Sequence, residues 1–236
     1  MNKTILKTLN ISKTFKTNSK RIELFKNVNL SIKSGELIAL VGPSGSGKTS
    51  LINLLSLLEK PNSGKIIFMD RDVINLSEKQ KNEIRQKNIS IIFQNNNLLT
   101  DFTAYENIEM PLIIRGEKNY KNKEKIKKIL KAVNLKDRSE HFPNELSGGE
   151  QQRVAIARAL IAETDLILAD EPTGNLDFKT SQEIFSYFVK LKKLNKAIIF
   201  ATHNRELANK ADYKLSISNG VIKRHNAKRW KIFHKF

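Results

Sequence analysis

Cysteine is absent from this sequence, tryptophan occurs once, and proline occurs five times in 236 residues. Without cysteine, neither a disulfide framework nor a thiolate metal site can stabilise the fold, and an intracellular location is allowed. No run approaches the roughly 20 apolar residues of a membrane span, and the N-terminus has only short apolar patches. We therefore expect no export signal and no transmembrane helix, so that work at a membrane would require a partner or surface contacts.

Acidic residues are also scarce, because 24 Asp and Glu stand against 42 Lys and Arg, a net charge of +18. Such an excess can indicate nucleic-acid binding or attraction to an anionic membrane surface. The lysines are scattered, however, and are accompanied by many asparagines and isoleucines, whose codons are rich in A and T. We therefore favour a biased genome composition as the origin of the charge and expect no nucleic-acid partner.

Apolar runs alternate with helical patterns along most of the chain, which is long enough for one large α/β domain. This alternation is typical of a largely parallel sheet flanked by helices. Two earlier segments, Ile5–Ser12 and Ile22–Ile32, resemble neighbouring strands joined by a lysine-rich turn and would add a small antiparallel portion. The predicted core strands are Leu37–Val41, Ile66–Met69, Ile89–Phe93, Leu166–Ala169 and Ala197–Ala201.

The strand signal disappears between Asn95 and Pro143, and Asn122–Val133 has apolar residues on one helical stripe. We therefore expect a helical subdomain over about 95–160, inserted in an α/β domain that spans 4–222. The segment 223–236 is a basic aromatic C-terminal tail, for which a disordered end and a membrane-interface contact are the alternatives.

A glycine-rich stretch, GPSGSGKT, occupies positions 42–49 between a predicted strand and the apolar helix Ser50–Leu58. This is the context of a phosphate-binding P-loop, in which backbone N–H groups face a phosphate chain at the positive end of a helix. Lys48 would reach the β- and γ-phosphates, and Thr49 would ligate Mg²⁺. A plain turn between strand and helix does not require this spacing. The predicted nucleotide-binding residues are Gly42, Pro43, Ser44, Gly45, Ser46, Gly47, Lys48, Thr49 and Ser50.

A second motif, DLILADE at 165–171, is an apolar strand that ends in two carboxylates. Asp170 is predicted to hold Mg²⁺ directly or through water, and Glu171 to polarise the attacking water as a general base. Two acids at this place can instead cap the next helix. Their occurrence together with a P-loop favours a nucleoside-triphosphatase site.

A third motif, LSGGEQQRVAIARAL at 146–160, combines a capping box of Ser147 and Glu150 with the buried face of a helix. Beside a P-loop, LSGGE resembles the signature loop of the ATP-binding-cassette (ABC) proteins, and other P-loop families lack it. The resemblance covers about 4–222. It implies an ATPase with a P-loop NTPase (RecA-like) parallel-sheet core, an antiparallel β annex and a helical signature subdomain, with ATP and Mg²⁺ as ligands.

The resemblance also implies roles for single residues. Phe15 matches the aromatic that stacks on adenine, and Gln94 matches the glutamine that contacts Mg²⁺ and the attacking water. His203 matches the histidine that contacts the γ-phosphate, which makes it catalytic together with Lys48 and Glu171.

Further residues match positions that act between two copies of an ABC protein. Asn175, Leu176 and Asp177 match the loop that crosses the dimer interface, which places Asp177 near the nucleotide. The signature residues Ser147, Gly148 and Gly149 of one chain are expected to bind the ATP held by the P-loop of a second copy. Two ATP molecules would therefore join a head-to-tail dimer.

A narrower resemblance concerns EPTGNLD at 171–177 and NNNLLTDFTAYENIEMPLIIRG at 95–116. Both resemble the ATPase subunits of lipoprotein-releasing (Lol) transporters and, more loosely, those of macrolide exporters and cell-division complexes. The stretch LLTDFTAYENIEMPL lies where family members form the groove for a coupling helix of the membrane subunit. The resemblance implies two Lol-type integral membrane subunits as partners, and a peripheral position on the cytoplasmic face of the inner membrane.

Several alternatives stay open at this point. Related ATPases serve exporters, importers and cell-wall hydrolase complexes, and only the partner separates them. Nucleic-acid- or ribosome-associated relatives usually carry two cassettes or a long coiled coil, and neither pattern is present. Two departures from the family pattern, Asn204 in place of an aspartate and Thr100 in place of a proline, remove no catalytic atom.

Overall fold

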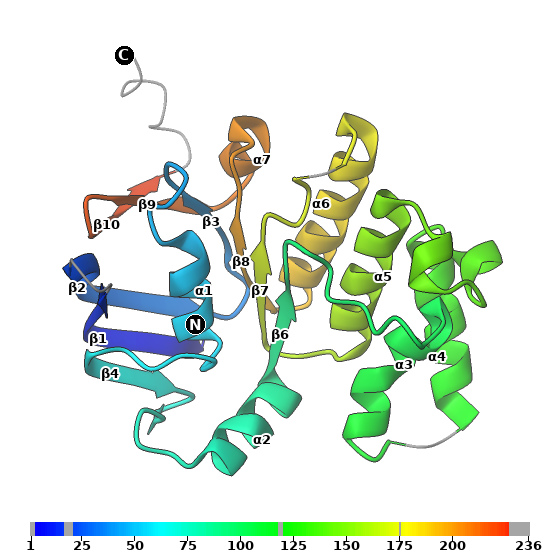
Figure 1. Cartoon of the computed structure of the whole chain (residues 1–236), viewed down its shortest axis with the longest axis horizontal. Coiled ribbons are helices and arrows are strands. Elements are labelled where there is room, and N and C mark those ends of the chain that lie inside the picture. The colour runs from blue at the N-terminus through cyan, green and yellow to red at the C-terminus, as the bar shows by residue number, and fades with distance from the viewer. Residues whose placement is uncertain (1–2, 17–20, 118–119, 175, 227–236) are drawn as a thin grey trace.

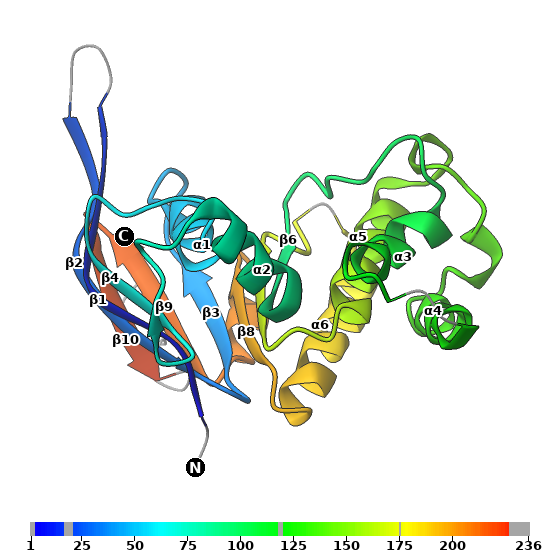
Figure 2. The same cartoon turned by 90° about the horizontal axis from the view of Figure 1, so that it is seen from below.

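The computed structural model describes residues 3–16, 21–117, 120–174 and 176–226, which form two sheets and a group of helices (Figures 1 and 2). The strands in these ranges are β1 (Thr4–Lys16), β2 (Arg21–Lys33), β3 (Leu37–Val41), β4 (Ser63–Phe68), β5 (Arg71–Asp72), β6 (Ile89–Ile92), β7 (Leu166–Asp170), β8 (Ala197–Ala201), β9 (Tyr213–Ser218) and β10 (Val221–Asn226). The α-helices are α1 (Lys48–Leu55), α2 (Glu78–Asn88), α3 (Ala104–Ile114), α4 (Tyr120–Ala132), α5 (Gly148–Ile161), α6 (Phe178–Lys193) and α7 (Arg205–Asn209).

The larger sheet has six strands in the order β10-β9-β3-β8-β7-β6. All neighbouring pairs are parallel except the edge pair of β10 and β9. The central strands β3, β7 and β8 are apolar and almost completely buried, as parallel strands covered on both faces must be. The predicted parallel core is confirmed, and two of its strands, Leu37–Val41 and Ala197–Ala201, have the expected limits.

The smaller sheet is antiparallel, in the order β2-β1-β4-β5. Its first two strands confirm the expected antiparallel portion. Ile66–Met69, which we expected among the core strands, belongs here instead, because β4 pairs antiparallel with β1 and places Phe68 opposite Leu6. The physical reason is visible in its burial: Ile66 and Phe68 are buried while Lys65 is exposed, which is the alternation of a half-covered strand.

Three apolar clusters hold these layers together. One lies between the two sheets and contains Leu51 and Leu55 of α1. The second lies on the other face of the six-stranded sheet, under α5, α6 and α7, where Phe188 packs on Phe200. The third joins α3, α4 and α5 into a helical group on the side away from the antiparallel sheet (Figure 1).

The helical group spans 104–161, against the range of about 95–160 that we expected for the subdomain. Helix α4 covers most of the predicted helix Asn122–Val133, and three apolar residues of the predicted stripe, Ile126, Leu130 and Val133, are buried. In the described part of the chain, no helix combines the length and apolar character needed to cross a membrane. Strand β10 ends at Asn226, four residues into the segment that we assigned to the tail, and 227–236 lie outside the described residues.

Candidate functional site

The buried strand β3 leads into the loop Gly42–Gly47, from which α1 starts at Lys48. Gly47 has φ +98°, and a Cβ there would lie 2.8 Å from Cε1 of Phe25, so a side chain at this position is excluded by both conformation and space. No side chain caps α1. The N–H groups of its first turn therefore stay available, at the positive end of the helix, for a ligand.

Lys48 is the first residue of α1, and only 7% of it is exposed. Its Nζ donates hydrogen bonds to the carbonyl oxygens of Gly42 at 3.1 Å and Pro43 at 3.2 Å, and lies 3.3 Å from Nε2 of His203. These three partners carry no negative charge. A phosphate group placed here would supply the anion that a buried ammonium group needs.

Thr49 and Asp170 bring two hard oxygen atoms together beside the loop. The Thr49 hydroxyl donates a hydrogen bond of 2.6 Å to Oδ2 of Asp170, which ends β7 and is 6% exposed. Mg²⁺ prefers such oxygen ligands and usually completes its shell with water and substrate phosphates. The described residues contain no cluster of three or more His, Asp or Glu that could hold a metal without such help. The pair therefore fits Mg²⁺ bound together with a nucleotide.

Glu171, the next residue, has an unusual backbone conformation with φ +47°. Its N–H donates to the carbonyl of Ala201 at 3.2 Å, and its own carbonyl accepts from Gly174 at 3.0 Å. The carboxylate accepts a bond of 3.3 Å from the backbone N–H of His203 through Oε2, while Oε1 lies 3.1 Å from the His203 Nε2 without a hydrogen-bond geometry. Strained residues of this kind cluster at active sites. The free acceptor position suits a general base.

These groups line one cleft of about 550 Å³. The lining residues are Phe15, Leu24, Ser44, Gly45, Gly47, Lys48, Thr49, Ser50, Gln94, Asp170, Glu171, Gly174 and His203. The cleft lies where β3, β7 and β8 end, because the carboxyl ends of parallel strands meet at one edge of a sheet. Leu24 and Gly174 are cleft residues that the sequence analysis missed. Gly174 lay within a motif that we quoted, whereas no local signal marks Leu24.

The remaining predicted nucleotide contacts surround the cleft in different ways. Phe15 is 42% exposed at its rim, and Nζ of Lys13 lies over its ring, 5.3 Å from the centroid. Gln94 is exposed two residues beyond β6. Gly42 and Pro43 contribute the carbonyls that hold Lys48 and do not line this cleft, and neither does Ser46, whose hydroxyl is buried.

The signature residues lie elsewhere. Ser147 caps α5: its hydroxyl accepts a bond of 3.3 Å from the N–H of Glu150, whose carboxylate accepts one of 2.8 Å from the N–H of Ser147. The bond from this backbone N–H is the main reason why the pKa of Glu150 lies below its usual value. Ser147, Gly148 and Gly149 do not line the cleft of their own chain, and the first two are exposed.

Two further predicted positions act as helix caps. Asp177, expected near the nucleotide, caps α6 by accepting a bond of 3.0 Å from the N–H of Thr180, and the hydroxyl of Thr180 is the main cause of its lowered pKa. Asn175 lies outside the described residues. Asn204 caps α7 through bonds from Glu206 and Leu207. Since Asn and Asp cap helices equally well, the departure from the family's aspartate is explained.

Known proteins share both the sequence and this arrangement. Residues 25–174 match the family model described as ABC transporter. The chain belongs to the ABC transporter family. Over 229 residues it is 44% identical to the lipoprotein-releasing system ATP-binding protein LolD of Wigglesworthia glossinidia brevipalpis, covering 95% of this chain and 99% of that protein. It is also 44% identical over 223 residues to LolD of Rickettsia bellii, covering 94% and 99%.

A solved structure gives the same result for the ABC transporter fold. The dimeric ATP-binding cassette MJ0796, in a post-hydrolysis state bound to ADP and Pi, superposes with a TM-score of 0.90 at 36% identity and covers 94% of this chain and 99% of that one. The predicted P-loop NTPase fold and ABC family membership are therefore confirmed. As an ABC transporter ATPase, the chain binds ATP and couples its hydrolysis to transport.

Proposed function

We propose that this ABC transporter ATPase drives the release of lipoproteins from the inner membrane, at whose cytoplasmic face it acts with two integral membrane subunits of the Lol type. The observation that carries the proposal is the similarity to two proteins named LolD, which extends over almost the whole chain. The segment 95–116 supports it, because this stretch resembles Lol ATPases and lies where a membrane subunit would dock.

The cleft supports a division of roles in ATP hydrolysis. Lys48 would pair with the β- and γ-phosphates, since its present partners carry no negative charge. Thr49 and Asp170, with Gln94, would hold Mg²⁺, which neutralises phosphate charge when bound. Glu171 would take the proton of the attacking water, and His203 beside it would contact the γ-phosphate.

The residues proposed to bind adenine, and those proposed to act from a second copy of the chain, lie on other surfaces. Phe15 would stack on the base at the rim of the cleft. Ser147, Gly148 and Gly149 lie at the N-terminus of a 14-residue helix, outside this cleft. We infer that they bind the γ-phosphate of ATP held by a second copy, to which the helix presents N–H groups and a positive dipole end. The dimeric state of the relative MJ0796 supports this arrangement.

A groove of about 200 Å³ between α2, β6, α3 and α5 would receive the membrane subunit. It is lined by Arg85, Gln86, Ile89, Ser90, Ile91, Pro111, Ile114, Arg158, Ala159 and Ala162. Ile114 is 61% exposed at its edge, and Phe102, close in sequence to α3, is 38% exposed. Exposed apolar side chains around a groove are typical of a docking surface for a helix. Tyr105, by contrast, packs against the helical cluster and would serve the fold.

Affinity purification from detergent-solubilised membranes, followed by identification of the co-purifying proteins, tests the proposal. We expect Lol-type membrane subunits with the wild type and with Leu194→Glu, an exposed control position at the end of α6. Ile114→Glu should lose them while retaining ATP binding. Recovery of macrolide-exporter or cell-division membrane subunits instead would assign the chain to one of those complexes and refute the lipoprotein-releasing role.

A further inference from the structure

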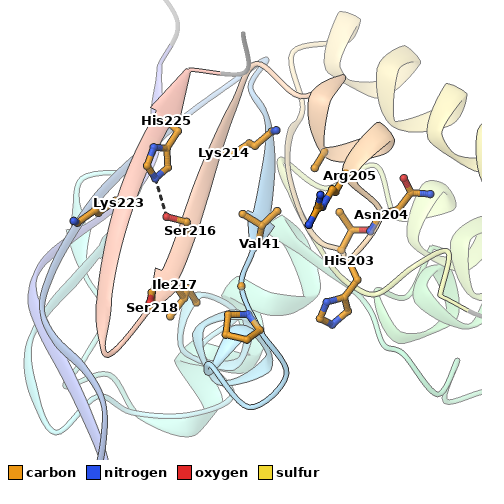
Figure 3. Close-up of a pocket in the computed structure, with 14 residues that line it drawn as sticks. Val41, His203, Asn204, Arg205, Lys214, Ser216, Ile217, Ser218, Lys223 and His225 are labelled. Carbon is orange, nitrogen blue, oxygen red and sulfur yellow. Dashed lines mark hydrogen bonds between the residues drawn. The ribbon is translucent and has the colours of Figure 1, made fainter. Parts of the chain in front are cut away.

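A second cavity, of about 720 Å³, lies between β9, β10 and the start of α7 (Figure 3). It is lined by Val41, Gly42, Pro43, Thr202, His203, Asn204, Arg205, Ala208, Lys214, Ser216, Ile217, Ser218, Lys223 and His225. We call it the basic cavity. Among the described residues, His203 is the one that lines both this cavity and the ATP cleft. Most of the residues that line the basic cavity therefore have no role in the proposed ATP hydrolysis.

The edge pair of the six-stranded sheet aligns its polar side chains on one face. In the antiparallel register, Lys223 lies opposite Ser216, and His225 lies opposite Lys214. Residues directly opposite each other in such a pair project from the same side of the sheet. The His225 Nε2 lies 2.8 Å from the Ser216 hydroxyl. Figure 3 shows Arg205 on the other wall, reaching from α7 toward Val41.

The charge of the lining has one sign. Arg205, Lys214 and Lys223 are cationic, two histidines accompany them, and none of the lining residues is Asp or Glu. Lys214 is only 1% exposed, and its ammonium group donates to the side-chain oxygen of Asn209. Burial lowers the pKa of Lys214, because a charged ammonium group is costly away from water.

The apolar side chains of Val41, Pro43 and Ala208 also line the cavity. The hydroxyls of Thr202, Ser216 and Ser218 add hydrogen-bond donors. Pockets that bind small molecules combine apolar walls with a few convergent polar groups, over roughly 300–1,000 Å³. The lining therefore matches a ligand with an anionic head that accepts several hydrogen bonds and an organic part that is apolar.

We propose that the basic cavity binds an organic phosphate, with its phosphate monoester held by Arg205 and Lys214, and that this ligand weakens ATP binding. A phosphate monoester matches because it carries up to two negative charges and several acceptor oxygens, and Arg can bind it in a bidentate manner. The head group of a lipid and a soluble metabolite share this chemistry.

The link to ATP rests on the proposed function and on two contacts. His203 lines both cavities, and the carbonyls that hold Nζ of Lys48 belong to Gly42 and Pro43, which line the basic cavity. An anion bound in the basic cavity would repel the negatively charged phosphates of ATP in the neighbouring cleft and would partly neutralise the positive charge that attracts them. The effect is reciprocal, so ATP must weaken the organic phosphate by the same factor.

Titration calorimetry with phenyl phosphate and with ATP tests the site. Lys214→Met and Arg205→Gln should each weaken phenyl phosphate binding about tenfold or more. Lys193→Met, at an exposed lysine on α6, is the matched control and should leave it unchanged. Arg205 is exposed, so its variant keeps the test valid if the buried Lys214 variant does not fold. Inorganic phosphate should bind more weakly than phenyl phosphate, because it lacks the apolar part.

Lys48→Met separates the two sites. It should abolish ATP binding and leave phenyl phosphate binding intact. Phenyl phosphate that is lost in Lys48→Met but retained in Lys214→Met and Arg205→Gln would place the ligand in the ATP cleft and overturn the proposal, as would the absence of any binding. ATP binding that survives Lys48→Met would count against the proposed function and not against the basic cavity.

Two comparisons identify the source of the phosphate and check the link. Glycerol 3-phosphate represents a soluble metabolite, and vesicles with phosphatidic acid, measured against vesicles of phosphatidylcholine alone, represent a lipid head group. Sensitivity to Arg205→Gln in either one supports the site and names its source. An ATP affinity that does not fall at saturating phenyl phosphate would refute the regulatory link.

Discussion

The phosphate-binding loop and the signature loop both place glycines at the N-terminus of a helix, but the two N-termini are capped differently. Helix α1 begins without a side-chain cap, and its first residue, Lys48, is held by groups that carry no negative charge. Helix α5 begins with a complete capping box of Ser147 and Glu150. The N–H groups at the start of α1 are available for a ligand, whereas those at the start of α5 are bonded in part by the side chain of Ser147.

This difference indicates which half of the proposed composite site is stable without nucleotide. A helix cap contributes roughly 1 kcal/mol, so α5 is stable while its exposed end faces solvent. The cleft, by contrast, collects Lys48, Asp170 and Glu171 from distant parts of the chain, and the first two are buried. We therefore expect the cleft to bind nucleotide in a single chain, and the signature loop to act, as proposed, only when a second copy brings its nucleotide to it.

The largest effect is expected for Glu171→Gln, which keeps the side-chain shape and removes the base. Hydrolysis should fall roughly 10²–10⁴-fold, with little change in ATP affinity. Single-turnover hydrolysis and nucleotide titration measure the two quantities. Glu163→Gln, a change at an exposed carboxylate outside the cleft, is the matched control. If ATP affinity fell as far as the rate, Glu171 would be a binding residue and the assignment of the base would be wrong.

Mixed dimers test the comparison directly, since Ser147→Arg blocks the signature loop by bulk and charge. With Glu171→Gln on one chain and Ser147→Arg on the other, a signature that acts across the interface leaves one site whole. Both changes on one chain, opposite a wild-type chain, damage both sites. We therefore expect more single-turnover hydrolysis by the first dimer, in preparations purified through different tags. The reverse ranking would show that the signature acts within its own chain.

Glycine-to-alanine changes should also separate the two loops. Gly47→Ala combines a positive φ with a clash on Phe25, and should destabilise the nucleotide-free protein by more than about 2 kcal/mol. At Gly148, a Cβ meets nothing within 4 Å, so alanine should be neutral or stabilising by up to about 1 kcal/mol. Denaturant unfolding measures both. Equal destabilisation would mean that the signature loop is as constrained as the P-loop.

The smallest effect concerns acid stability and the cap of α5. Because the folded-state pKa of Glu150 lies below its unfolded value, its contribution is present above that unfolded value, about 4.3, and is lost as the pH falls through the folded pKa. Glu150→Gln should therefore lower the melting temperature by less than about 3 °C at pH 7 and not at all below about pH 3. A difference in melting temperature that did not change with pH would show that the charge of Glu150 does not contribute.

Much of the cleft could be predicted, because its chemistry follows local order in the chain. The P-loop spacing and the two acids after an apolar strand each fix a position at the end of a strand, and parallel strands bring those ends together. The place of His203 came only from the family resemblance, since a lone histidine carries no local signal. Leu24 was missed because it is one of many apolar strand residues, and only the pairing of the strands brings it to the cleft.

The pairing of β4 and the basic cavity could not be predicted for a related physical reason. Alternating burial reports which face of a strand is covered, but not which strand lies beside it. Ile66 and Phe68 are buried as expected, but they belong to the antiparallel sheet and not to the parallel one. Lys214 resembles an ordinary exposed strand lysine in the sequence, and only the three-dimensional packing around it buries it.

The position of β3 in the sheet has a consequence for how the protein is made. This strand lies between β8 and β9, so Leu37–Val41 has no strand partner until β8 has been synthesised as far as Ala201, and it lacks its second partner until Ser218. At 5–20 residues per second, that delay is on the order of 10–30 s. During this time the nascent chain carries an apolar segment without its sheet neighbours, and the nucleotide-binding cleft is among the last parts to form.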